Sequence, residues 1–151
     1  MLLQPFSHLS QTYDGVASRV LAEPARVSAL QAAVRERKDL RRFAISGDYW
    51  ILSPTTGGAP SGLADPTRWA AWQLHDPDED TGCVTLLRRP NATEASITLG
   101  LRGLSASVTF NVSFASGFMI DRAEQMSGEK LAALSVQLEP SHSIVLRYTR
   151  L

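Results

Sequence analysis

The chain has 151 residues, of which 44% are hydrophobic, 20% charged and 7% aromatic. This length is typical of one domain, or of one domain with a short appendage, and it is enough to bury a core without metals or disulfides. Fifteen basic residues balance fifteen acidic ones, so no field of the whole molecule draws it to nucleic acid or to an anionic membrane. The single cysteine, Cys83, excludes an internal disulfide framework and a cysteine-based zinc site.

The N-terminal segment, residues 1–23, carries little periodic pattern, and we expect an irregular lead-in there with at most one short helix. It lacks the basic start and the apolar stretch of a secretory signal. No apolar run in the chain approaches the ~20 residues that a membrane-spanning helix requires. We therefore expect a soluble protein in the cytoplasm, with no membrane partner.

Residues 24–42 have the period of an amphipathic helix. Val27, Leu30 and Val34 recur at three-to-four spacing. Pro24 suits the first turn of a helix, where its missing N–H costs nothing. The sequence predicts no second helix to cover this apolar stripe, so we expect the stripe to be buried on the sheet, on a second copy of the chain or on another domain.

From Gly47 onward the pattern is that of short strands separated by turns. Residues 53–62 are rich in Gly, Pro and Ser and are predicted to form a loop. The predicted strands are Trp69–Leu74, Cys83–Arg88, Ser96–Leu101, Val108–Phe114, Leu134–Leu138 and Ile144–Tyr148. Several of them alternate apolar and polar residues. The sequence therefore predicts a mainly β fold, an antiparallel β-sandwich of the Greek-key type preceded by one amphipathic helix.

Three features are weak candidates for chemistry. The acidic turn at residues 76–80 offers carboxylates to calcium, but its glycine spacing and its closing residue differ from those of an EF-hand loop, so we interpret it as a solvated hairpin turn. The basic run at residues 35–42 interleaves acids, which favours a solvated helix face over a nucleic-acid site. His142 lies between two serines, but no Gly-X-Ser-X-Gly motif accompanies it. We predict no catalytic residue, metal site or cofactor in this chain.

The tryptophans Trp50, Trp69 and Trp72 are candidate sugar-stacking residues, because an exposed aromatic face is the side-chain surface on which a sugar ring stacks. Trp69 and Trp72 are three positions apart, which places them on opposite faces of a strand. At least one of these two is therefore expected in the core, where large aromatic side chains contribute to packing.

Several short motifs follow one another in a recognisable order. They are Gly47-Asp48-Tyr49-Trp50, Trp69–Leu74, Arg88–Asn91, Leu99–Leu104 and Ser127–Leu131. Together they resemble the C-terminal β-sandwich domain of melibiase-type α-galactosidases and related glycoside hydrolases. In that family the last helix of a catalytic (β/α)₈ barrel passes into the sandwich through a Gly-Asp-Tyr/Phe-Tyr motif. The resemblance covers residues 26–151, and Trp50 and Phe110 stand where the family commonly has Tyr.

The resemblance implies that residues 1–46 are a lead-in and helix left from the end of a catalytic barrel, and that residues 47–151 are the accessory sandwich. It implies a non-catalytic domain that packs on the barrel and stabilises it, since the catalytic aspartates of a barrel lie on strands that precede this region. Asp48 would cap or brace the backbone at the junction. The expected partner is a barrel, or a second copy through helix 24–42. Two alternatives stay open, a carbohydrate-binding module and an independent small hydrolase.

Overall fold

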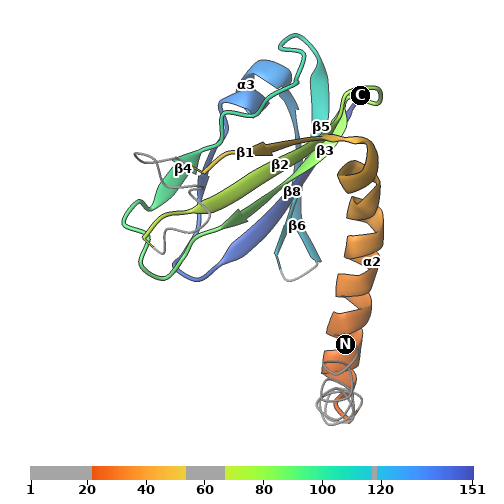
Figure 1. Ribbon diagram of the computed structural model, residues 1–151, viewed down its shortest axis with the longest axis vertical. Helices are drawn as coiled ribbons and strands as arrows, with labels where there is room; N and C mark the ends of the chain where they lie inside the picture. The colour runs from red at the N-terminus through yellow and green to blue at the C-terminus, as the bar shows by residue number, and fades with distance from the viewer. Residues whose placement is uncertain (1–21, 54–66, 117–118) are drawn as a thin grey trace, which may run out of the picture. The chain divides into compact units, whose positions relative to one another are not determined.

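The computed structural model describes residues 22–53, 67–116 and 119–151. These residues belong to two compact units, one ending at Lys38 and one covering Asp39–Leu151, and each is described by itself. The described part of the first unit is essentially a single helix, and the strands found in the described residues all belong to the second unit (Figure 1).

Helix α2 covers Pro24–Ser46. It begins at the predicted residue but continues past the predicted end at residue 42, because Phe43 in its last turn is a buried core residue of the second unit. Leu30 and Val34, of the predicted apolar stripe, are exposed. No helix in the described ranges is both long enough and apolar enough to cross a membrane.

Two antiparallel sheets build the second unit, and the predicted mainly β fold is thereby confirmed. The larger sheet has the strand order β1-β2-β3-β8-β5-β6, and the smaller has the order β4-β7. Strand β8 returns to lie beside β5 while β7 lies in the other sheet, which is the kind of return found in Greek keys. The strands are β1 (Asp48–Ile51), β2 (Ala70–Asp76), β3 (Thr81–Leu87), β4 (Ser96–Thr98), β5 (Thr109–Ser116), β6 (Met119–Ser127), β7 (Ser135–Gln137) and β8 (Ser143–Arg150).

The core lies between the inner face of the six-stranded sheet and a layer formed by the small sheet and helix α3 (Gly128–Ala132). Figure 1 shows β4 and α3 on the same side of the larger sheet. The alternation of apolar and polar residues noted in the predicted strands places their apolar side chains in this core. The larger sheet contributes Val84, Leu86, Phe110, Val112, Phe114, Leu146 and Tyr148, and the facing layer contributes Ile97, Leu99, Leu101, Leu131 and Val136, all of them buried.

Some predicted elements differ from the observed ones. The strand predicted at Ser96–Leu101 ends at Thr98, since Gly100 has a φ of 59° and Gly103 a φ of 80°, values outside strand geometry. Strands β1 and β6 and helix α3 were not predicted at all. Two of the core leucines, Leu99 and Leu101, still bond through their N–H groups to the carbonyls of Leu134 and Ala132, so the layer continues beyond the short strand.

Candidate functional site

The junction motif joins helix α2 to strand β1 through a single residue, Gly47. Its N–H donates to the carbonyl oxygen of Phe43 at 3.0 Å and closes the helix. A Cβ at this position would lie 2.6 Å from that oxygen and 2.7 Å from the carbonyl oxygen of His75. Glycine is thus required by the close approach of two backbone segments. Asp48 is exposed as the first residue of β1.

The three tryptophans lie in different surroundings. Trp69 is 3% exposed and its indole N–H donates to the carbonyl oxygen of Glu94 at 2.9 Å. The sequence predicted that at least one of Trp69 and Trp72 is in the core, and Trp69, just before the start of β2, is that residue. Trp50 is half-buried, pairs in register with Gln73, and has its ring centroid 6.0 Å from that of His75. Trp72 is half-buried on the opposite face of β2. The structure therefore does not bring the three side chains together on one sugar-stacking surface.

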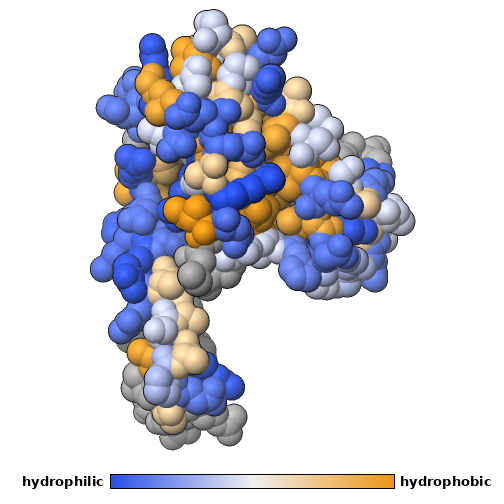
Figure 2. Space-filling view, turned by 180° about the vertical axis from the view of Figure 1, so that it is seen from behind, coloured by the Kyte–Doolittle hydropathy of each residue, from blue (hydrophilic) through white to orange (hydrophobic). Residues whose placement is uncertain are grey.

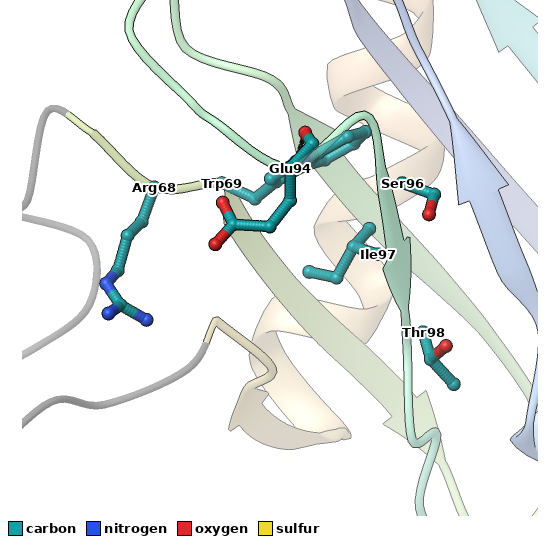
Figure 3. A pocket seen from close by; sticks show the side chains of 6 residues that line it. All are labelled: Arg68, Trp69, Glu94, Ser96, Ile97 and Thr98. Carbon is teal, nitrogen blue, oxygen red and sulfur yellow. Dashed lines mark hydrogen bonds between the residues drawn. The ribbon is translucent and has the colours of Figure 1, made fainter.

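A small hollow lies beside Trp69, between the start of β2 and strand β4 (Figure 3). Its volume is about 220 Å³, and Trp69 and Ile97 form its apolar part. The side chains of Glu94 and Arg68 lie on the same side of it. The pKa of Glu94 is lowered by a hydrogen bond from its own backbone, by a hydrogen bond from the Thr93 side chain and by the positive charge of Arg68. The hollow is smaller than the 300–1,000 Å³ of ordinary ligand pockets, and the tryptophan is part of its wall.

Sequence reasoning missed a polar cluster inside the core. The side-chain nitrogen of Gln73 donates to the hydroxyl of Tyr148 and to the carbonyl oxygen of Arg102, both at 2.8 Å, and its oxygen accepts from the N–H of Arg102 at 2.9 Å. The Nδ1 atom of His75 lies 3.0 Å from the same hydroxyl. All three side chains are at most 1% exposed. The cluster therefore ties β2 to β8 and to the loop before β5.

Burial raises the pKa of the Tyr148 hydroxyl far above its ordinary value. The hydrogen bond from Gln73 lowers this pKa, and electrostatic interactions with Cys83 and Asp80 raise it further. The hydroxyl therefore stays protonated and serves as a neutral hydrogen-bonding centre. Two glycines leave the space that the side chains of Tyr148 and His75 occupy. A Cβ at Gly82 would collide with the Tyr148 hydroxyl, and one at Gly103 would lie 2.6 Å from the ring of His75.

The remaining chemical candidates lie apart. The acidic segment forms the β2–β3 hairpin turn, where one carboxylate oxygen of Asp76 accepts the N–H groups of Asp78 and Glu79. Within residues 22–53, 67–116 and 119–151, no group of three or more His, Cys, Asp or Glu is placed to hold a metal ion. His142 is exposed on the turn before β8, with its Nδ1 atom 3.1 Å from the carbonyl oxygen of Pro140. His8 lies outside the described residues.

The outer face of the larger sheet is apolar at its β1 edge. Tyr49 and Ile51 of β1 are 53% and 37% exposed, and their register partners on β2 are Leu74 and Trp72, both half-buried. Because residues paired across antiparallel strands point to the same side, the four side chains share one surface, which we call the β1–β2 outer face. Figure 2 shows the molecule from behind, and on that side too apolar side chains are interspersed with hydrophilic ones.

No protein-family model matches the chain, and no curated protein matches it either. The resemblance to the accessory domain of melibiase-type glycoside hydrolases therefore stays a prediction from the sequence.

Proposed function

We propose that this chain is a non-catalytic accessory domain that packs on the catalytic barrel of an α-galactosidase-like glycoside hydrolase and stabilises it. The observation that carries the proposal is the junction at Gly47. Helix α2 passes into β1 without a linker, and the last helical turn is anchored by the buried Phe43. Binding modules that move independently of their neighbours are joined by linkers of several flexible residues. A last helical turn that passes directly into the sheet edge instead suits a domain fixed to the structure that contains the helix.

The β1–β2 outer face supports the same proposal. Tyr49 and Ile51 lie two residues apart on the edge strand. Removing these exposed apolar side chains from water is favourable, and neighbouring exposed apolar side chains mark surfaces that another protein surface covers. Aromatic residues of this kind are enriched in the buried centres of protein interfaces. We assign this face to the contact with the barrel. The cytoplasmic location predicted from the sequence belongs to the same proposal.

Chemically, the domain would contribute binding energy and no reacting group. The His75 ring faces Tyr148 inside the core, where both side chains are fully buried. Glycoside hydrolysis instead needs two carboxyl groups about 5–10 Å apart on either side of an accessible sugar bond. In the proposed enzyme those groups come from the barrel.

Sedimentation velocity of the chain mixed with a melibiase-type barrel, prepared without its own C-terminal sandwich, tests the proposal. We expect a one-to-one complex. The double variant Tyr49→Ser/Ile51→Thr should weaken the complex at least about tenfold, because it removes two apolar side chains from the contact. The matched control is Ile120→Thr, which changes an exposed isoleucine at the opposite edge of the sheet. If barrel and wild-type chain sediment separately at every ratio, the proposal is wrong.

A further inference from the structure

Strand β6 forms the second edge of the larger sheet, opposite to the edge formed by β1. It is nine residues long, against four in β1, and among the described strands it pairs with β5 alone. Residues 120–125 are all exposed. The outward side of an edge strand carries unpaired N–H and C=O groups, which can pair with a strand of another chain. Within the described ranges, β6 is thus the longest strand with such an open side.

The pairing of β6 with β5 limits where a further strand can be added. From Arg122 to Ser127 the register with β5 is continuous, and Arg122 lies opposite Phe114. Before Arg122 the register shifts, which leaves Asp121 without a partner on β5. The Asp121 carboxylate accepts the N–H of Ser116 at 2.8 Å at this bulge. Since a bulge bends its strand and interrupts the ladder, regular pairing on the open side of β6 begins next to Asp121.

The charges on β6 are arranged symmetrically about Ala123. Arg122 and Glu124 flank this residue, and both side chains lie on the core-facing side of the sheet, because their partners on β5, Phe114 and Val112, are buried. Within one chain the Arg122 guanidinium lies 3.7 Å from the Glu124 carboxylate. The two side chains are 62% and 45% exposed, so this ion pair adds little to the stability of the single chain. Both charged groups are accessible to a second molecule.

One two-fold register of two antiparallel β6 strands matches this pattern. In such a pair, residues that lie opposite each other are equally far from the residue on the axis. With Ala123 on the axis, Arg122 of each chain lies opposite Glu124 of the other. The same register puts the neutral Gln125 opposite Asp121. Centring the pair on Arg122 or on Glu124 would instead set two like charges directly opposite each other, which is unfavourable.

From this match we infer that β6 pairs with the β6 strand of a second copy of the chain, antiparallel about Ala123, so that the two larger sheets join into one. Charged side chains on an edge strand normally prevent pairing with other strands. Here the same charges attract when the added strand is another β6 in this register. The small Ala123 on the axis also avoids a contact between two identical long side chains.

The dimer is expected to be weak, because the bulge keeps the paired segment short. An interface below about 1,200 Å² is typical of transient association, and we expect a dissociation constant of about 10 µM to 1 mM. The β1–β2 outer face lies at the other edge of the sheet. The inference therefore does not depend on the proposed docking to a barrel, and either can fail without the other.

Sedimentation velocity of the chain alone, over the concentration range just given, tests the inference. We expect a monomer–dimer equilibrium for the wild type. Arg122→Glu and Glu124→Arg each place like charges opposite each other in this register, so each should weaken the dimer at least about tenfold. The matched control is Arg150→Glu, the same change at an exposed position of the interior strand β8, which should leave the dimer unchanged.

An equimolar mixture of the two weakened variants tests the register itself. Arg122→Glu has two acidic residues beside Ala123, and Glu124→Arg has two basic ones, so every charge in a mixed pair meets an opposite charge. We expect the mixture to form a dimer at least as tight as that of the wild type. A fault in the folding of either variant would not be repaired by mixing.

Three results would each overturn the inference. The first is a wild-type chain that stays monomeric at about 1 mM, the weak end of the expected range. The second is a dimer that both charge reversals leave intact, since it would form through another surface such as helix α2. The third is a mixture of the two variants that stays as monomeric as each variant alone.

Discussion

Tyr148 lies where the polar and apolar parts of the core meet. Its ring packs edge-on against Phe110, with centroids 5.9 Å apart, and stacks with His75 at the same distance. Its hydroxyl bonds to Gln73 and His75, and its backbone carbonyl accepts from the Thr81 hydroxyl at 2.8 Å. One residue thus joins the apolar core to the hydrogen bonds between β2, β3 and β8.

Removing this hydroxyl should cost stability without changing the packed volume by much. In Tyr148→Phe the Nδ1 atom of His75 loses its hydrogen-bonding partner in a buried site, and Gln73 keeps only its bonds to the Arg102 backbone. We expect the free energy of unfolding in urea to fall by about 1–3 kcal/mol. Tyr49→Phe, the same change at an exposed site, should alter it by less than about 0.5 kcal/mol. Equal effects of the two variants would contradict the role given to the cluster.

The same residue makes stability depend on alkaline pH. The Tyr148 hydroxyl has its pKa raised by burial, whereas a tyrosine in the unfolded chain ionises near pH 10. Above about pH 10 the unfolded state therefore loses the proton first. The stabilisation is complete below that pH and declines as the pH rises toward the folded-state pKa.

Urea unfolding at about pH 8 and pH 11 should show this decline in the wild type. Tyr148→Phe has no such group, so the difference in free energy of unfolding between wild type and variant should shrink at the higher pH. A difference that stays constant or grows with pH would show that the hydroxyl ionises as easily in the folded protein as in the unfolded one.

The alternation of residues along single strands accounts for only part of this cluster. Gln73 and His75 alternate with half-buried residues along β2, so their position on the inner face follows from the strand period. Their partner Tyr148 is 73 residues away from His75 in the sequence, and it meets them only because β8 pairs with β3. Strand order is a tertiary property, and the alternation within single strands does not determine it.

At the level of elements, the transition from α2 to β1 depends on one glycine. Gly47→Ala would place a methyl group against two backbone carbonyls, which cannot rotate away as a side chain can. We expect a loss of about 1–3 kcal/mol in the free energy of unfolding, the usual cost of overpacking. Asp48→Ala, at the exposed neighbouring position, should cost less than about 0.5 kcal/mol. If both variants lose equally little free energy of unfolding, the backbone at the junction moves to accommodate the methyl group, and the glycine is not required there.

The missed elements share a physical cause. Strand β6 carries Asp121, Arg122, Glu124 and Gln125, all exposed, so it lacks the alternation that marks a half-buried strand. Strand β1 has four residues and lies at the other edge of the sheet. The five-residue helix α3 is capped by the Ser127 side chain, which accepts the N–H of Lys130. Edge strands and very short helices are stabilised by contacts with neighbouring elements, so the local sequence does not predict them.

At the level of the whole molecule, the sequence was sufficient for the mainly β fold and for most of its core. Alternating apolar residues on β5 and β8 point inward as predicted, since burial of one face determines which residues face the core. The candidate sugar-stacking tryptophans did not predict a binding surface. Their distribution over two faces of the sheet depends on strand pairing, which the sequence pattern does not determine.

The measurement that tests the central claim most directly is the melting temperature of a melibiase-type barrel lacking its own sandwich, with and without this chain. A ligand present at about 100 times its dissociation constant stabilises the folded state by about 2.7 kcal/mol. For a barrel of about 250 residues that corresponds to a rise of roughly 5–10 °C. The account predicts this rise with the wild-type chain and its loss with Tyr49→Ser/Ile51→Thr. An unchanged melting temperature with saturating wild-type chain would contradict it.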